Sequence, residues 1–369
     1  MMQLLFFAIS SLILLLGHFA CWYVVIGLFQ INFWQEQVIV GAILFLFFIS
    51  IVFASYLIHK WDNFFTRWYY IFAGLWAGLL VNLVLMATLI LIIKFSGQAF
   101  NFNIPAFYFK IIFVGGASLV SFIGIYRAWN PSIVEYEVAI KDLPSIWDGK
   151  VIVQISDVHL GPVYREKFFS RVINKIKEIG PEAVFITGDL FDGMEADFSW
   201  LNNPFKKLTP PQGIYYGFGN HDLYLGFDRV SGLLQENSVK ILDNRMLVVD
   251  GLQIIGINYS FEDNFDLAEA ILRQVGYDEK LPSILLFHAP KNIEMAKRAG
   301  IDLQLSGHTH DGQMFPFNLI AKLAHSGYGY GLFREGDFSL VVNGGVGTWG
   351  PPMRTAARGE IVKIILKKK

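Results

Sequence analysis

The chain has 369 residues, of which 54% are hydrophobic and 17% are charged, and its formal net charge is -1. Nucleic-acid-binding proteins usually carry a basic surface that displaces counterions from phosphates, so we expect no nucleic acid among the partners. The single cysteine, Cys21, excludes a disulfide or a thiolate metal cluster within this chain. Hydrophobic residues are concentrated in the N-terminal third, which predicts an apolar helical region at 1–130 and a separate domain at 131–369.

Four runs in the N-terminal region are long enough to cross a membrane as helices, which takes about 20 apolar residues. The first run lacks a basic segment before it and is too long for a signal peptide, so we interpret it as a retained helix. We expect His18, inside this run, to be hydrogen bonded between helices. These runs predict an integral, multi-pass membrane protein with a bundle of four transmembrane helices at Leu4 to Phe29, Val38 to Leu57, Tyr70 to Ile93 and Ile104 to Tyr126.

Basic residues next to the runs predict the orientation in the membrane. Four crossings leave the N-terminus and the C-terminal domain on the same side, together with Lys60, Arg67 and Arg127. Lys94 and Lys110 flank the opposite side. Because positive residues are enriched on the cytoplasmic side, this distribution of three charges against two favours a cytoplasmic C-terminal domain.

From Val134 onward, short strand patterns alternate with helical spacing, which predicts an α/β domain. Five predicted strands each end in polar residues that can bind metals. Ligands of open α/β sheets collect outside the carboxyl ends of the strands, so we expect these ends to converge on one crevice. The strands and the residues that follow them are Val151 to Ile155 with Asp157 and His159, Ala183 to Thr187 with Asp189, Ile214 to Phe218 with Asn220 and His221, Ser283 to Phe287 with His288, and Leu303 to Leu305 with His308 and His310.

The donor atoms at these strand ends indicate the kind of metal. Imidazole, carboxylate and amide groups without thiolates suit Mn, Fe, Zn or Ni better than soft metals. Asp157 and His159 are two residues apart, so on an extended segment both side chains would point to the same side. His308 and His310 repeat this spacing, and we expect each pair to be able to bind one ion.

Five short motifs occur in a fixed order: D-x-H from Asp157, G-D-x-x-D from Gly188, G-N-H-D from Gly219, the lone His288, and G-H-T-H from Gly307. Together they resemble the calcineurin-like metallophosphoesterase superfamily, and in particular its membrane-associated bacterial branch. The resemblance covers residues 134–366. It implies an α/β (α+β) fold in which a four-layer β-sandwich is flanked by helices, and a hydrolase that acts on phosphoesters.

The resemblance also implies a dinuclear metal centre with two divalent ions, Mn, Fe or Zn. Two cations about 3.5 to 4 Å apart can bind both a phosphoryl oxygen and a bridging hydroxide that attacks in line. Asp189 would bridge both ions. The implied ligands are Asp157, His159 and His310 for the first ion, and Asn220, His288 and His308 for the second.

Catalytic roles away from the metals fall to His221 and Asp192. His221 is expected to face the substrate and to protonate the leaving group or stabilise its charge. Asp192 either holds the His221 ring in one tautomer or caps the segment that follows it. Protein phosphatases of the superfamily have an arginine where this chain has Gly193, which disfavours phosphoproteins as substrates, and Asp311 replaces the first glycine of the usual G-H-T-H-G-G-Q.

Three functions are consistent with these features. The first is a membrane-anchored metallophosphoesterase with an amphiphilic substrate, whose acyl chain could contact the apolar segment Met314 to Leu323. The second is a phosphodiesterase or pyrophosphatase acting on a nucleotide-linked lipid such as UDP-diacylglucosamine, by analogy with relatives. The third is a metal-binding membrane sensor or scaffold without turnover. The roles of His325 and Arg354 stay open, since Arg354 could bind phosphate or pair with Glu360.

Overall fold

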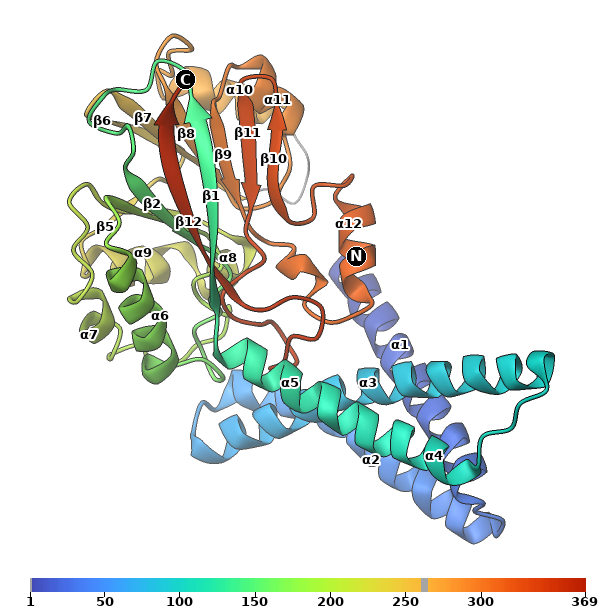
Figure 1. Ribbon diagram of the computed structural model, residues 1–369. Helices are drawn as coiled ribbons and strands as arrows, with labels where there is room; N and C mark the ends of the chain where they lie inside the picture. Colours follow the sequence, from blue (N-terminus) through green and yellow to red (C-terminus); the bar gives the residue numbers. More distant parts are fainter. Residues whose placement is uncertain (1, 260–264) are drawn as a thin grey trace. The chain divides into compact units, whose positions relative to one another are not determined.

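The computed structural model describes residues 2–259 and 265–369, and the chain divides into two compact units. The first unit comprises residues 1–126 together with Gly350–Met353, and the second comprises residues 127–349 and 354–369. Helices build the first unit, whereas strands with helices on their outer faces build the second (Figure 1).

The first unit contains four helical stretches that are long and apolar enough to cross a membrane, which confirms the prediction of four N-terminal apolar helices. In the fourth stretch a π-helical turn, η1, lies between two α-helices and contains Gly115 and Gly116. The side chain of Asn63 caps the third helix by accepting from the main-chain N–H groups of Phe65 and Thr66. The elements are α1 (Met2–Phe29), α2 (Trp34–Lys60), α3 (Phe64–Phe100), α4 (Ala106–Lys110), η1 (Ile111–Gly116) and α5 (Ala117–Trp129).

Polar groups inside this unit are bonded between helices. Trp76 of α3 donates from Nε1 to Nε2 of His18 at 3.0 Å. His18 donates from Nδ1 to the carbonyl of Leu14 at 2.8 Å, because a carbonyl can only accept. His18 is therefore an interhelical hydrogen-bonded residue, as predicted.

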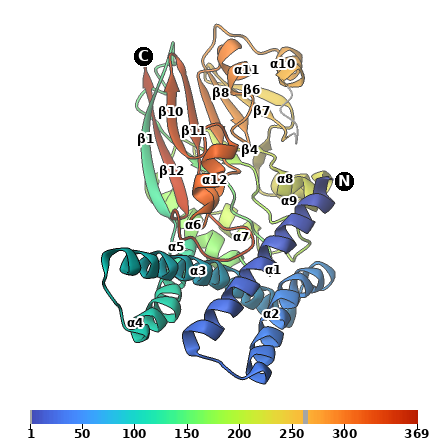
Figure 2. The same cartoon turned by 90° about the vertical axis from the view of Figure 1, so that its right-hand side faces the viewer.

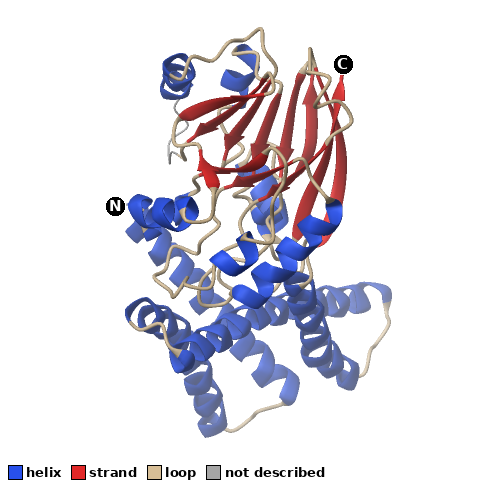
Figure 3. Cartoon of the chain, turned by 90° about the vertical axis from the view of Figure 1, so that its left-hand side faces the viewer, coloured by secondary structure: helices blue, strands red, loops and turns tan. Residues whose placement is uncertain are grey.

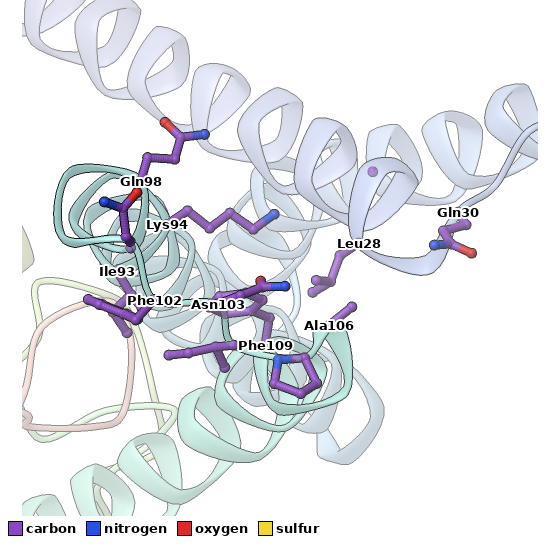
Figure 4. A pocket seen from close by; sticks show the side chains of 14 residues that line it. Leu28, Gln30, Ile93, Lys94, Gln98, Phe102, Asn103, Ala106 and Phe109 are labelled. Atoms are coloured by element: carbon purple, nitrogen blue, oxygen red, sulfur yellow. The ribbon is translucent and has the colours of Figure 1, made fainter.

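A hollow of about 810 Å³ lies at one end of the helices, between α1, α3 and the connection that leads into α4. Figure 4 shows its lining, which includes Lys94, Gln98 and Asn103. The ammonium of Lys94 lies 5.2 Å from the ring centre of Phe109, so a cation–π contact holds it at this helix end.

The first sheet of the second unit has six strands in the order β1-β12-β2-β3-β4-β5. The strands from β2 to β5 are parallel, β12 is antiparallel to β2, and β1 is parallel to β12. The bounds are β1 (Ser132–Ile140), β2 (Val151–Ile155), β3 (Ala183–Thr187), β4 (Gly213–Gly217), β5 (Val239–Ile241) and β12 (Glu360–Lys368).

The second sheet also has six strands, in the order β10-β11-β9-β8-β7-β6. Its four central strands are parallel, and the two edge strands β6 and β10 are antiparallel to their neighbours. The bounds are β6 (Arg245–Val249), β7 (Leu252–Ile257), β8 (Ser283–Phe287), β9 (Leu303–Ser306), β10 (Gly331–Glu335) and β11 (Phe338–Val342).

The two sheets pack face to face because their central strands are apolar on both faces. Phe185 of β3 lies in the core between the sheets, whereas its neighbours Val184 and Ile186 lie in the core under the helices, as the period of two requires. Helices cover the outer faces (Figure 3), which confirms the metallophosphoesterase-type α/β fold with two mixed sheets. The helices are α6 (Glu166–Ile179), α7 (Asn202–Phe205), α8 (Asn220–Leu225), α9 (Phe227–Gln235), α10 (Phe265–Gln274), α11 (Ile293–Arg298) and α12 (Phe317–Ala324), with the 3-10 turn η2 at His310–Gly312.

Polar side chains join the two sheets at the carboxyl ends of their strands. Gln154 of β2 is fully buried and donates from Nε2 to the hydroxyl of Thr187 at 3.0 Å and to the carbonyl of Ser306 at 2.8 Å. Thr187 ends β3 and Ser306 ends β9, so this amide links the first sheet to the second. The link lies directly below the loops that carry the predicted metal ligands, and it holds those loops at one end of the sandwich.

Candidate metal centre

The predicted ligands follow the carboxyl ends of strands from both sheets. Asp157 and His159 follow β2, Asp189 follows β3, and Asn220 and His221 open α8 after β4. From the second sheet, His288 follows β8, and His308 and His310 follow β9. The strands belong to two packed sheets and not to one open sheet, but the parallel direction of both sets brings their ends together.

The first cluster consists of Asp157, His159 and His310. Nε2 of His310 lies 3.0 Å from Nε2 of His159 and 3.3 Å from Oδ1 of Asp157. Nε2 of His159 lies 4.0 Å from the same carboxylate oxygen. Two ring nitrogens can face each other this closely only with a proton or a cation between them, so this triangle is a candidate cation site.

The second cluster consists of Asp189, His288 and His308. Nε2 of His288 lies 3.2 Å from Oδ2 of Asp189 and 3.3 Å from Nδ1 of His308. Nδ1 of His288 donates to the carbonyl of Thr187 at 2.7 Å, and this bond directs Nε2 toward the cluster. Nitrogen and oxygen donors therefore converge here as they do in the first cluster.

Asn220 presents a buried oxygen without a hydrogen-bond donor. Its side chain is buried, and among the residues that the structure describes no donor reaches Oδ1. A buried carbonyl oxygen without a donor is uncommon in a folded protein, and a bound cation is one way to satisfy it. This orphaned oxygen fits the ligand role that we expected for Asn220.

The spacing of the donor atoms fits metal ions. Zinc binds nitrogen and oxygen ligands at about 2.0 to 2.2 Å, so two ligands of one ion are about 3.0 to 3.5 Å apart. Four of the five donor-to-donor distances in the two clusters fall between 3.0 and 3.3 Å, and the fifth is 4.0 Å. The residues present therefore fit a metal centre without a rearrangement of the backbone.

Burial and charge set the protonation of these groups. Burial lowers the pKa of His308 to about 3 and also lowers the pKa of His310, so both rings are in the neutral form that binds metals. Burial opposes a charge on His288 as well, but the Asp189 carboxylate outweighs it and raises the pKa of His288 to about 10. The second cluster thus attracts a positive charge, which a metal cation can provide in place of the proton.

Five of the seven predicted ligands have a left-handed backbone, with φ between 50° and 71°. The expectation of extended segments was wrong, since Asp157 and His159 turn with φ of 52° each, and His308 and His310 face different clusters. Aspartate and histidine adopt this conformation more readily than most residues, yet it is still strained, and such strain gathers at functional sites. The five residues are Asp157, His159, Asp189, His308 and His310.

Two glycines are required by the close approach of the ligand loops. A Cβ at Gly307 would lie 1.9 Å from the hydroxyl of Ser156 and 2.4 Å from Oδ2 of Asp157. A Cβ at Gly219 would lie 2.2 Å from Oδ1 of Asp189. The glycines of G-H-T-H and G-N-H-D therefore make room for the two carboxylates.

Sequence reasoning gave no role to Asp222, which joins two of the ligand loops. Its fully buried carboxylate accepts from the main-chain N–H groups of Asp189 at 2.7 Å, Gly219 at 2.9 Å and Phe191 at 3.1 Å. These bonds fix the loop after β3 against the start of α8. The signal was present as the last letter of G-N-H-D, but the partners Asp189 and Phe191 are 33 and 31 residues away in the chain.

His221 lies next to the first cluster, with its ring centre 4.8 Å from that of His159. Its Nδ1 donates to the main-chain carbonyl of Asp192 at 2.9 Å, which leaves Nε2 available for proton exchange. The carboxylate of Asp192 instead lies 3.2 Å from Nδ1 of His159. Asp192 thus lies against both rings, with its main chain at His221 and its side chain at His159. Gly193 has a φ of 81°, and a Cβ there would lie 3.1 Å from the His221 carbonyl.

Aromatic residues flank His221 on its exposed side. Tyr224 and Trp349 have ring centres 5.3 Å and 5.8 Å from that of His221, and both are about half exposed. The amide of Gln313 holds the main chain of Trp349, since it accepts from the Trp349 N–H at 2.9 Å and donates to its carbonyl at 3.1 Å. The glutamine of the H-T-H-D-G-Q segment therefore positions the rim of the site.

Arg354 and His325 both lie against metal-ligand candidates. Arg354 is fully buried and donates to the carbonyl of His310 at 3.2 Å and to its Nδ1 at 3.3 Å. The carboxylate of Glu360 instead accepts from the N–H of Gly344 at 2.8 Å and from the Tyr330 hydroxyl at 2.8 Å. The ring of His325 lies 5.9 Å from that of His308.

Comparison with known proteins identifies the family. Residues 150–312 match the family described as calcineurin-like phosphoesterase. The chain is 34% identical over 266 residues to an uncharacterized metallophosphoesterase of Campylobacter jejuni, with 70% of this chain and 71% of that protein covered. It is 33% identical over 268 residues to a transmembrane protein with metallophosphoesterase domain of Danio rerio, with 66% of this chain and 59% of that protein covered.

An uncharacterized metallophosphoesterase of Helicobacter pylori is 34% identical over 223 residues, which cover 59% of this chain and 60% of that protein. The fold and the ligand clusters define a metal-dependent phosphoester hydrolase. The chain belongs to the calcineurin-like phosphoesterase family. Its four apolar helices, together with relatives named as transmembrane proteins, indicate that it associates with a membrane.

Removal of the Asp222 carboxylate tests whether its hydrogen bonds hold the ligand loops in place. Asp222→Ala leaves three buried main-chain N–H groups without their acceptor, and each unsatisfied buried group costs about 1 to 3 kcal/mol. We expect a lower melting temperature in detergent and less bound metal per chain, measured by thermal unfolding and elemental analysis. Asp228→Ala, at an exposed position on α9, is the control and should change neither value. Normal metal content in Asp222→Ala would show that these bonds do not position the ligands.

Proposed function

We propose that the second unit hydrolyses phosphoesters with two divalent ions, Mn, Fe or Zn. Asp189 would be the shared ligand, because its carboxylate contacts His288 and also acts on His159, whose pKa it raises against the lowering effect of burial. The observation that carries the proposal is the presence of two separate groups of donors, Asp157 with His159 and His310, and Asp189 with His288 and His308. Asp157, His159 and His310 would hold the first ion, and Asn220, His288 and His308 the second.

When bound, two divalent ions supply positive charge to the phosphoryl oxygens and lower the pKa of a water nucleophile for in-line attack. Around them, the chain orients the substrate and moves the proton. His221 donates from Nδ1 to the Asp192 carbonyl, so its Nε2 is the atom that would give a proton to the leaving oxygen. The Asp192 carboxylate would keep the His159 ring in its ligand orientation.

A third grouping, His159, Asp192 and His221, also brings donor atoms within 4.8 Å of one another. We assign no ion to it. Nδ1 of His221 already donates to a carbonyl, and Nδ1 of His159 faces the Asp192 carboxylate at 3.2 Å. His221 is thus left for proton transfer.

Metal dependence tests this function directly. The full chain, purified in detergent and supplied with Mn, should hydrolyse an aryl phosphate ester and contain two metal ions per chain by elemental analysis. Chelation should abolish turnover and lower the melting temperature, because metal ions stabilise the state that binds them. Asp189→Asn should lose metal and activity together, whereas Asp228→Asn should retain both. Absence of turnover with each of Mn, Fe, Zn and Mg would contradict the proposal.

His221→Ala separates catalysis from metal binding. Removing a general acid lowers kcat by about 10² to 10⁴-fold, and the metal content should stay at the wild-type value. Steady-state kinetics and elemental analysis check the two parts, with the exposed His59→Ala as the control. An unchanged kcat would remove the proposed role, and loss of metal would make His221 a ligand instead.

Two other functions compete with this one. A pyrophosphatase or phosphodiesterase acting on a nucleotide-linked lipid such as UDP-diacylglucosamine would use the same metals, and the four apolar helices favour a substrate of this kind. A membrane sensor or scaffold without turnover would have no need of His221 and its ordered hydrogen bond. A phosphoester screen that includes lipids and nucleotide-linked lipids distinguishes the three.

We place the catalytic domain on the cytoplasmic face, from the excess of Lys60, Arg67 and Arg127 over Lys94 and Lys110. Protease added to intact cells should then leave the second unit uncut, and it should cut the second unit once the cells are lysed. Cleavage in intact cells would reverse the orientation.

A further inference from the structure

Helix α12 is an exposed apolar helix beside the metal-ligand loops. None of its eight residues is buried, and Leu319, Ile320 and Leu323 have exposed fractions of 54%, 57% and 82%. Phe315 and Phe317, at its beginning, are 47% and 40% exposed. Large contiguous apolar surfaces on a folded domain mark interaction sites, so this helix requires a partner.

Both ends of the α12 segment are tied to the metal centre. The helix begins seven residues after His310, and the residue that follows it, His325, packs its ring 5.9 Å from the ring of His308. Thr309 donates from its hydroxyl to the carbonyl of Gly329 at 2.6 Å, which closes the segment into a loop. Figure 2 shows α12 next to the ends of β10 and β11. Whatever covers α12 therefore lies at the rim of the metal centre.

Strand pairing shows at which end of the sandwich the chain enters it. The last apolar helix, α5, ends at Trp129, and β1 begins at Ser132, opposite Glu360 of β12. Two residues further along β12, Val362 is opposite Gln154 of β2. The chain thus passes from its last membrane-spanning candidate into the sandwich at the carboxyl end of β2, which is the end that carries the metal ligands.

The composition of α12 matches an interfacial membrane helix. Such helices place Phe and Leu among the lipid chains and keep Lys at the polar headgroups. Lys322, the one charged residue in α12, is exposed among the apolar side chains and can reach a phosphate with its flexible stem.

We propose that α12, with Phe315, inserts into the headgroup region of the bilayer and presents the phosphate of a membrane-resident lipid phosphoester to the metal centre. The lipid as substrate rests on the proposed function, whereas the insertion does not. Leu319, Ile320 and Leu323 contact the acyl chains, and Lys322 contacts the lipid phosphate.

A depth measurement tests the insertion in the full chain. Cys21 is the only cysteine, so Cys21→Ala, or Cys21→Ser if the former folds poorly, allows a fluorescent label at Leu323→Cys. In lipid nanodiscs with brominated acyl chains, the label should shift to the blue and be quenched at least about twofold relative to unbrominated lipid.

Val248→Cys is the matched control. Val248 is also exposed and apolar, but it lies on β6, at the edge of the second sheet opposite β10, into which α12 leads (Figures 1 and 2). We expect no quenching there. A label at position 323 that is not quenched, or that shifts to the blue without quenching, overturns the proposal. The latter result would mean that protein covers α12, either helices of the same chain or a second copy.

Hydrolysis tests the substrate class separately. Ile320→Glu with Leu323→Glu should lower kcat/KM for a long-chain phosphatidic acid by at least about tenfold, which corresponds to about 1.4 kcal/mol. Turnover of a water-soluble aryl phosphate should stay unchanged, and Val248→Glu should change neither.

Equal losses on both substrates would make α12 a structural support of the metal centre and overturn the proposal. If the wild-type chain hydrolyses neither substrate while the label at position 323 is quenched by lipid, the proposed function fails and the insertion stands. If only the soluble ester is hydrolysed, the substrate part of the proposal fails.

Discussion

Several carboxylates and imidazoles are buried at one end of the sandwich, and burial of such groups costs free energy unless hydrogen bonds and opposite charges compensate it. The Asp222 carboxylate supplies part of the compensation, because it accepts from the main chain of the loop that carries Asp189 and from that of the loop that precedes Asn220. Asp189 in turn lies against His288 and accepts from the N–H of His221. The arrangement of the metal-ligand candidates depends on these two carboxylates.

The strained backbone of the ligand loops is the second consequence of this packing. The left-handed residues after β2, β3 and β9 would relax if the strand ends could move. The Gln154 side chain limits this movement, because it bonds to Thr187 at the end of β3 and to Ser306 at the end of β9 and so joins the two sheets. Stiff, buried strands thus hold strained polar loops. This division of roles positions donors of two different sheets about 3 Å apart, as between His159 and His310 and between Asp189 and His288.

Three features of the chain bear on its association with a membrane. Four apolar helices and relatives named as transmembrane proteins indicate a membrane, and the path of the chain into β1 leads to the metal-binding end of the first sheet. An exposed apolar helix beside the ligand loops is costly in a soluble enzyme. At a bilayer the same helix would have a partner, as we propose for α12.

Local patterns in the sequence determined the four apolar helices and five of the strands, because each is a matter of residue type and short spacing. The two-sheet fold and the set of candidate ligands followed instead from the resemblance of five ordered motifs to a known family. Three features were decided only by the tertiary structure: the left-handed turns that separate His308 from His310, the Asp222 bonds, and the Asp192 main-chain contact to His221. Each depends on loops brought together by two packed sheets. Contacts between residues about 30 or more positions apart follow from strand order and register, which hydrophobic periodicity does not encode.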